Sequence, residues 1–169
     1  MINLKELDEL YRSNEGIKFD PVPYGTYWVK IYSLQRIYEP EKGRDRIRVV
    51  YQILNEGDYQ NFGIRESFFL SENVKIETQV FQYGNIKKFF LTINPNIDFN
   101  FETMDQLEEN LKLYMTSIHN VKFLIDYQID SKGYGRVYIQ KREAYVPEED
   151  QNKEEFESYQ NEMKKMGYY

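Results

Sequence analysis

The stretch Val22-Pro-Tyr-Gly-Thr-Tyr-Trp-Val-Lys-Ile-Tyr32 predicts a turn that is followed by a strand. Because successive side chains of a strand point to opposite faces, this strand has two distinct faces. They hold Tyr27, Val29 and Ile31 on one side, and Trp28, Lys30 and Tyr32 on the other. The first face predicts a core contact. The second places two large aromatic rings beside a cation, so it requires either a covering element or a flat, negatively charged ligand.

The composition predicts one soluble domain. The chain has 169 residues, of which 41% are hydrophobic and 17% aromatic, enough to bury a single core. Cysteine is absent, which excludes disulfide bonds, thiolate metal sites and a cysteine nucleophile and fits a reducing compartment. No apolar run approaches the roughly 20 residues of a membrane span. We therefore expect a cytoplasmic protein that makes no membrane contact.

The net charge of -6 is concentrated at the two ends of the chain. Residues 147–169 hold seven acidic residues and three lysines, and residues 1–20 hold five acidic and three basic residues. The part between them, residues 21–146, has sixteen residues of each sign. A neutral body allows a local basic face, although it excludes a globally positive field.

Two further strands are predicted after a charged turn at residues 39–45. In residues 46–54, alternation turns one row inward and the other outward. The inward row is Ile47, Val49, Tyr51 and Ile53, and the outward row is Arg46, Arg48, Val50 and Gln52, joined by Arg44 if the strand begins earlier. A turn at residues 55–61 leads to a third strand at residues 62–70. Short turns between three strands indicate an antiparallel meander.

Helical periodicity appears in three segments. An N-terminal helix within residues 1–16 is expected to cover part of the sheet or one end of a barrel, through Leu4, Leu7, Leu10 and Tyr11, with Gly16 as its stop signal. Ser71 is the expected N-cap of a second helix, and Gly84 is a candidate break in it. Its expected apolar stripe is Val74, Thr78, Phe81, Phe89 and Ile93. A third helix is expected to start at Thr103, with Gln106 as its capping-box partner.

Two strands are predicted to close the body. Residues 121–129 and 134–142 alternate in polarity around a hairpin turn at Asp130-Ser-Lys-Gly133. The last strand turns Val137 and Ile139 inward and carries outward Tyr134, Arg136, Tyr138, Gln140 and Arg142. This order predicts a mainly β protein with helices: a five-stranded OB-like antiparallel barrel with a helical insertion between strands 3 and 4. The domain is residues 1–146, and residues 147–169 form an acidic tail. The alternative is an α+β sandwich in which two helices cover one face of an open antiparallel sheet.

Several of these segments resemble a known family. They are Pro23-x-Gly25-x-Tyr27-x-Val29-Lys30-Ile31, the run from residue 46 into Glu56-Gly57-Asp58-Tyr59, and the closing strand pair after a leucine-bearing helix. Together they look like the phage-encoded single-stranded-DNA-binding proteins of OB-fold type, long catalogued as a family of unknown function. The resemblance covers about residues 20–142. It implies a domain that serves phage replication or recombination in the host cytoplasm, and it transfers no ligand-contacting residue. The turn after Tyr59 reads Gln-Asn-Phe-Gly, where the family usually has a basic residue and a glycine.

The outward rows supply the chemistry for binding single strands. Bases of a single strand stack on aromatic rings, at ~1–3 kcal/mol per base, while basic side chains follow the phosphates. The candidate nucleic-acid-binding residues lie on the first, second and fifth strands, which we expect to be neighbours in a small closed barrel. They are Trp28, Lys30, Tyr32, Arg44, Arg46, Arg48, Tyr134, Arg136, Tyr138 and Arg142. In the alternative reading, these side chains form cross-strand ladders on a solvated face, or Trp28 lies under the N-terminal helix.

Other features predict no chemistry. His119 is the sole histidine, and no serine, carboxylate pair or second histidine is placed with it. Asp126, Asp130 and the acids of residues 39–45 lack the spacing of a calcium loop. We expect no catalytic residue, no metal and no cofactor.

The acidic tail carries aromatic residues at near-helical spacing. The resemblance implies that it recruits replication or recombination proteins and competes with nucleic acid for the basic face, and the candidate partner-binding residues are Phe156, Tyr159, Tyr168 and Tyr169. A tail that only keeps the protein soluble is the alternative.

The sequence thus predicts a non-enzymatic protein that binds single-stranded DNA with little sequence preference. The first alternative is a protein-binding phage accessory or anti-defence factor, whose acidic surface contacts a host protein or imitates DNA. A further alternative is an enzyme subunit whose active site lies elsewhere. A homo-oligomer is compatible with each of them.

Overall fold

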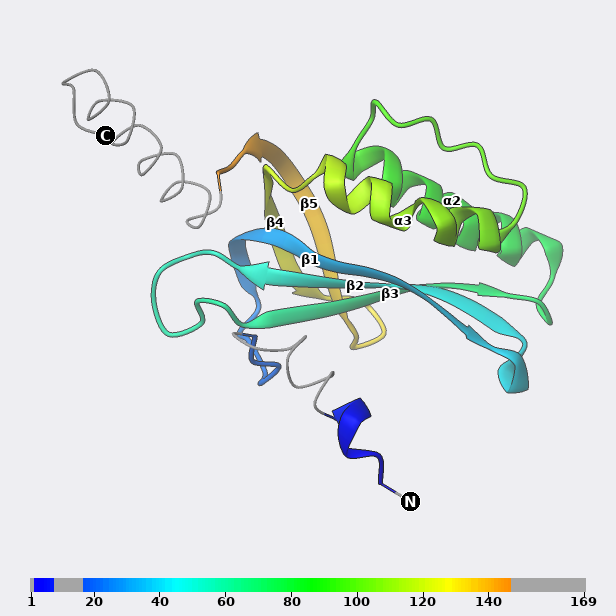
Figure 1. Ribbon diagram of the computed structural model, residues 1–169, viewed down its shortest axis with the longest axis horizontal. Coiled ribbons are helices and arrows are strands. Elements are labelled where there is room, and N and C mark those ends of the chain that lie inside the picture. Colours follow the sequence, from blue (N-terminus) through cyan, green and yellow to red (C-terminus); the bar gives the residue numbers. More distant parts are fainter. Residues whose placement is uncertain (1, 8–16, 147–169) are drawn as a thin grey trace, which may run out of the picture.

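The computed structural model describes residues 2–7 and 17–146. Five strands form one antiparallel sheet in the order β3-β2-β1-β4-β5, and two helices lie together on one side of it (Figure 1). The elements are β1 (Gly25–Glu39), the short 3-10 helix η1 (Pro40–Lys42), β2 (Arg44–Ile53), β3 (Gly63–Ser71), α2 (Ile76–Ile93), α3 (Met104–Ser117), β4 (Val121–Ile129) and β5 (Gly135–Ala144). The expected features at Leu10, Tyr11 and Gly16, and those in the tail at Phe156, Tyr159, Tyr168 and Tyr169, lie outside the described residues.

The architecture confirms a mainly β protein with a helical insertion between the third and fourth strands. The sheet is open, because β3 and β5 at its two edges share no ladder of backbone hydrogen bonds. The expectation that β5 neighbours β1 is wrong, since β4 pairs with β1 on one side and with β5 on the other. The strand order is consistent with an OB-like fold, although closure into a barrel is absent from the described strands.

β1 is the central strand and is much longer than predicted. It continues seven residues past Tyr32, where the predicted strand ended, and it pairs with β2 up to its last residue, Glu39. β4 pairs with it only from Gly25 to Val29. A bulge at Tyr32 moves the register, so that Ile31 and Leu34 both face the core. The far half of β1 therefore projects beyond β4, where α3 contacts it.

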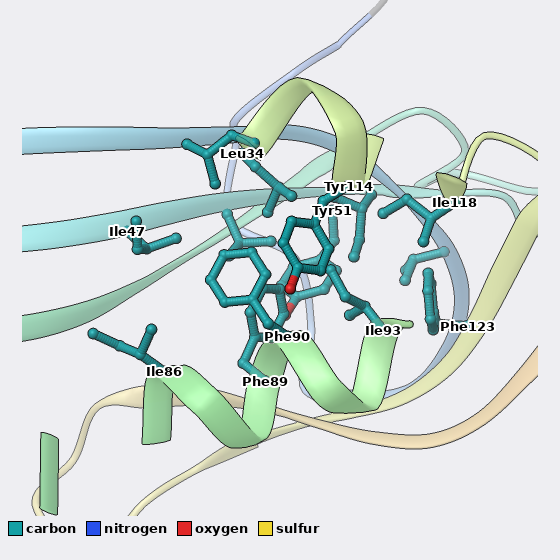
Figure 2. Close-up of a cluster of buried hydrophobic side chains, with 14 of the residues drawn as sticks. Leu34, Ile47, Tyr51, Ile86, Phe89, Phe90, Ile93, Tyr114, Ile118 and Phe123 are labelled. Carbon is teal, nitrogen blue, oxygen red and sulfur yellow. The ribbon is translucent and has the colours of Figure 1, made fainter. Parts of the chain in front are cut away.

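The core lies between the sheet and the two helices. The inward row predicted for β2 is confirmed, because Ile47, Val49, Tyr51 and Ile53 are all fully buried. Figure 2 shows α2 directing Phe89, Phe90 and Ile93 toward the sheet, with Tyr114 of α3 beside Phe90. The centroids of the Phe90 and Tyr114 rings are 4.7 Å apart, so aromatic contacts join the two helices above the strands.

The helix boundaries confirm one prediction and correct two. α3 begins as expected, since the Thr103 side chain accepts a hydrogen bond from the Gln106 backbone N–H. α2 does not begin after Ser71, which is the last residue of β3, and it runs unbroken through Gly84. The predicted stripe is also wrong in the first half of this helix, because Phe81 is 70% exposed. The inward face there carries Gln79 and Gln82, which hydrogen bond to Ser71.

The two described leucines of the N-terminal segment, Leu4 and Leu7, do not pack on the sheet. Residues 4–7 are helical, and the Asn3 side chain accepts hydrogen bonds from the backbone N–H groups of Lys5 and Glu6. Leu4 and Leu7 are 77% and 50% exposed, so the predicted packing of their apolar face is wrong. Among the described residues, no helix has both the length and the apolar character that a membrane span requires.

Candidate nucleic-acid interface

The first candidate surface is the tryptophan cluster, formed by Trp28, Lys122 and Lys141. Pairing of β1 with β4 and of β4 with β5 sets Leu124 between Trp28 and Lys141 on the outward face of the sheet. The ammonium nitrogens of Lys122 and Lys141 lie 4.4 and 5.9 Å from the centroid of the half-buried Trp28 ring. Each cation is attracted by the electrons of the ring face. An aromatic surface and two lysines thus meet on three neighbouring strands, and Glu143 forms an ion pair with each ammonium group, at 3.9 Å with Lys122 and 3.3 Å with Lys141.

A bulge in β5 determines which residues join this cluster. Ile139 pairs with Ile125 and Lys141 pairs with Leu124, so Gln140 is the extra residue. The predicted outward placement of Arg142 is therefore wrong. Its side chain lies on the helix side, where Nε donates to the carbonyl oxygen of Ile93 at the end of α2, at 3.1 Å. A cation suits the negative end of the helix dipole, so Arg142 has a structural role.

The second candidate surface is the arginine row on the outward face of β2 and β3. Its members are Arg44, Arg46, Arg48 and Arg65. Arg44 and Arg46 share the carboxylate of Glu39, at 3.0 and 3.7 Å, and Arg44 also lies over the ring of Phe69. The hydrogen bond from Arg44 is the main cause that lowers the pKa of Glu39. One carboxylate thus neutralises part of the positive charge at this end of the row.

No carboxylate among the described residues neutralises Arg48 or Arg65. Among the described residues neither has an ion-pair partner, and the buried Nε of Arg48 finds no hydrogen-bond acceptor. Burial, followed by repulsion from Arg65 and Arg46, lowers the pKa of Arg48, while the guanidinium remains charged. The guanidinium of Arg65 is stacked 3.8 Å from the ring centroid of Phe19. Within the described part of the chain, this pair thus holds positive charge close to apolar groups.

The two surfaces lie on the same face but at different positions along β1. Trp28 is near one end of the strand, whereas Arg48 is opposite Gln35, seven residues further along. At 3.2–3.4 Å per residue in a strand, this separation is about 20 Å. Lys30 and Tyr32 lie between them and are half-buried, lining a hollow with Ile118 and His119.

The predicted residues of β5 and the hairpin before it form a third, smaller group. Tyr134 and Tyr138 are 65% and 48% exposed. Arg136 donates to Asp130 at 3.0 Å, so its charge is paired. Because β4 separates β5 from β1, these residues extend the tryptophan cluster but do not adjoin the arginine row. Three cations of these surfaces, Lys122, Lys141 and Arg65, were not predicted from the sequence. Only Lys122 had a sequence signal, because the alternation of β4 places it on the outward face.

The acidic side chains considered as metal ligands have other partners. Asp126 accepts a hydrogen bond from the Thr26 hydroxyl at 2.7 Å. Asp130 accepts hydrogen bonds from the backbone N–H groups of Tyr134 and Lys132, and these bonds together with Arg136 lower its pKa. In the described part of the chain, no group of three or more histidine, aspartate or glutamate side chains is placed to hold a metal ion.

Comparison of the chain with models of protein families, with curated proteins and with solved structures found no match. The case for a function therefore depends on the two surfaces themselves.

Proposed function

We propose that this protein binds single-stranded DNA, without catalysis, on the outward face of an OB-like sheet. The observation that carries the proposal is the pair Arg48 and Arg65. Two guanidinium groups near a third, Arg46, repel one another, and burial of the Arg48 Nε adds a desolvation cost. A polyanion offsets both costs, because its phosphate oxygens supply the missing acceptors and the opposite charge.

The tryptophan cluster supplies the second half of the interaction. A single strand presents base faces, and a half-buried indole ring with two lysines beside it can stack on a base while the lysines reach adjacent phosphates. Tyr134 and Tyr138 extend the aromatic surface toward the hairpin. Stacking and phosphate contacts do not distinguish one base from another, so we expect little sequence preference.

The sign of this face argues against its use as a DNA mimic. A mimic must present an excess of carboxylates, whereas the arginine row and the two lysines of the tryptophan cluster outnumber Glu39 and Glu143, the carboxylates that pair with them. The alternative of a protein-binding accessory factor would then have to use another surface. A role in phage replication or recombination rests on the family resemblance, and it stays part of the proposal.

Titration of the full chain with an oligothymidylate tests the proposal. Trp28 is the only tryptophan, so quenching of its fluorescence reports contact at the tryptophan cluster itself. We expect quenching at low salt that weakens with added salt, with a slope near -0.7 in log K against log salt for each phosphate contact on a single strand. A duplex of the same length should bind more weakly, because its base faces are already stacked.

A matched pair of charge-removing variants separates specific from general electrostatics. Arg48→Gln removes a cation from the arginine row, and Lys132→Gln removes an exposed cation from the hairpin. The first should weaken binding and lower the salt slope, while the second should change neither by much. Absence of binding at low salt, or equal effects of the two variants, would rule the proposed face out.

A further inference from the structure

Residues Ile17, Lys18 and Phe19, here called the N-terminal strap, lie alongside the beginning of β3. Lys18 forms an isolated parallel bridge with Phe62, and its carbonyl oxygen accepts a hydrogen bond from the Gly63 N–H at 2.8 Å. Ile17 is buried. Backbone pairing and one buried side chain therefore fix the strap against this edge of the sheet.

Gly63 leaves the space that the strap occupies. It pairs with Gln52 of the outward row, so a side chain at this position would point to the outward face. A Cβ here would lie 2.6 Å from Cε1 of Phe19 and 3.0 Å from Cγ2 of Ile17, closer than carbon atoms pack. The glycine thus lets the ring of Phe19 lie directly on the outward face of β3.

The ring of Phe19 supports the side chain of Arg65. Arg65 is two residues beyond Gly63, so both positions have the same face of the strand. The guanidinium carbon lies 3.8 Å from the ring centroid, which is the separation of two planar groups in face-to-face contact. In the described part of the chain, the Arg65 side chain is nevertheless exposed. A ring on one face of the guanidinium leaves its opposite face and its edges for a ligand.

We propose that Phe19 and Arg65 form a second base-stacking site, in which a nucleobase of a single strand lies on the open face of the Arg65 guanidinium. This inference rests on the proposed binding of single-stranded DNA and adds a subsite to it. Bases stack on arginine planes as they do on aromatic rings, because the guanidinium is flat and weakly hydrated. The N–H groups at its edge donate to a phosphate at the same time.

The Phe19–Arg65 site is distinct from the tryptophan cluster. Trp28 is on β1 and Arg65 is on β3, and β2 lies between these strands. Neighbouring strands are 4.7–4.9 Å apart, so the two sites are separated by about 10 Å across the sheet alone. Each site therefore holds a different base of the same strand. Arg48, on the intervening strand, contacts the phosphates.

A substitution that conserves charge separates stacking from simple attraction. Arg65→Lys keeps the positive charge but replaces the plane by a compact ammonium group. Fluorescence anisotropy compares two labelled ligands of equal length and charge, oligothymidylate and the same sugar–phosphate chain without bases. Arg65→Lys should bind oligothymidylate roughly five- to tenfold more weakly than the wild type, with an unchanged salt slope. It should bind the base-free chain as the wild type does.

Arg48→Lys is the matched control, because it makes the same exchange at a phosphate contact. Any loss of affinity that it causes should be equal on the two ligands. Two substitutions of Phe19 then test its role as a positioning residue. Phe19→Leu removes the flat support and should reproduce the base-dependent loss of Arg65→Lys, whereas Phe19→Tyr keeps a ring and should restore the affinity. Urea denaturation shows whether each variant is folded under the conditions of the titration.

The outcomes distinguish this site from the proposed function as a whole. An Arg65→Lys variant that binds oligothymidylate as tightly as the wild type overturns the stacking site. An equal loss on both ligands overturns it too, because Arg65 would then contact only phosphate. In both cases, quenching of Trp28 by oligothymidylate leaves the proposed function in place. A Phe19→Leu variant with full affinity overturns the role of Phe19, and a wild-type chain that binds neither ligand at low salt overturns both proposals.

Discussion

The side chain of Glu66 on β3 accepts a hydrogen bond from the backbone N–H of Val137 on β5, at 3.1 Å. These two strands are the opposite edges of the sheet, and they share no ladder. The other carboxylate oxygen accepts from the hydroxyl of Tyr51 on β2, at 3.0 Å. One buried carboxylate thus brings together the two edges that an OB-like barrel would join by backbone pairing.

The first prediction concerns the pH dependence of stability at Glu66. Burial raises the pKa of Glu66, against hydrogen bonds from Val137 and Tyr51 that favour the charged form. Because the pKa of Glu66 is higher in the folded protein than in the unfolded chain, the fold favours the protonated carboxyl group. The contribution of Glu66 to stability is therefore complete below the unfolded pKa, and it is lost as the pH rises through the folded pKa. In Glu66→Gln the amide oxygen accepts from the Val137 N–H, and the amide NH2 donates to the hydroxyl oxygen of Tyr51, so two hydrogen bonds are kept without a charge. Its free energy of unfolding should therefore rise relative to that of the wild type as the pH rises from about 4 to about 8.

Urea denaturation at several pH values measures this difference. Glu66→Ala serves as the control, since it leaves the Val137 N–H and the fully buried Tyr51 hydroxyl without their acceptor. It should lower stability by about 1–3 kcal/mol in this pH range. Parallel stability curves for the wild type and Glu66→Gln would show that the carboxylate is not destabilised in the fold.

The second prediction separates stability from binding at Arg48. Arg48→Met removes a charge that Arg46 and Arg65 repel, and it keeps the aliphatic part of the side chain. We expect the free protein to be as stable as the wild type or more stable, while its affinity for a single strand falls. Thermal unfolding and oligonucleotide titration measure the two effects. A variant that loses both would indicate that Arg48 supports the sheet and does not serve as a phosphate contact.

The third prediction concerns the aromatic half of the interface. Trp28→Leu removes the indole face near Lys122 and Lys141 and keeps an apolar group on the strand. If one base stacks on the ring, affinity should fall by about 1–3 kcal/mol, with little change in the salt slope, because no phosphate contact is removed. Fluorescence anisotropy of a labelled oligonucleotide measures this, since the variant lacks tryptophan. Tyr59→Leu, on an exposed loop, is the control and should bind as the wild type does.

The fourth prediction concerns the ion pair that joins the sheet to α3. Arg36 donates to both oxygens of Asp45, at 2.6 and 2.8 Å, and to Asp105 in the first turn of α3. Arg36→Met leaves the buried Asp45 without its partner and should cost about 2–3 kcal/mol in denaturant unfolding. Arg44→Met breaks a pair with Glu39 that is more exposed than the Arg36–Asp45 pair, and it should cost less. Equal losses of unfolding free energy in the two variants would mean that the burial of Asp45 adds nothing to the stability that its ion pair contributes.

The sequence predicted the regular parts of this fold because burial on one face leaves a clear alternation. β2 is the best case, since its inward row is buried as expected and Arg46, Arg48 and Gln52 of the outward row are half-buried, although Val50 of that row is buried. The two bulges, at Tyr32 and Gln140, left no such signal, because one extra residue inverts every later side chain without changing the composition. The inverted placement of Arg142 follows directly.

The inward face of the first half of α2 was predicted wrongly for a different reason. Both faces of this part of the helix offer a helical repeat, one through Phe81 and one through Gln79 and Gln82. Periodicity favoured the apolar repeat, whereas the structure turns the half-buried glutamines toward the sheet, because their amides reach Ser71 at the end of β3. The pairing of β4 with β1 was equally hidden, since no local pattern records which distant strand completes a sheet.

β1 runs as one strand from the tryptophan cluster to the arginine row, so it fixes the distance between these two surfaces. A loop between the two surfaces would let each find its own part of a ligand, whereas a strand paired with β2 along its length holds them at one spacing, about 20 Å. A nucleic acid must then reach a minimum length before it can use both. Affinity should rise in a step as an oligonucleotide is lengthened across that span, and further nucleotides should add little.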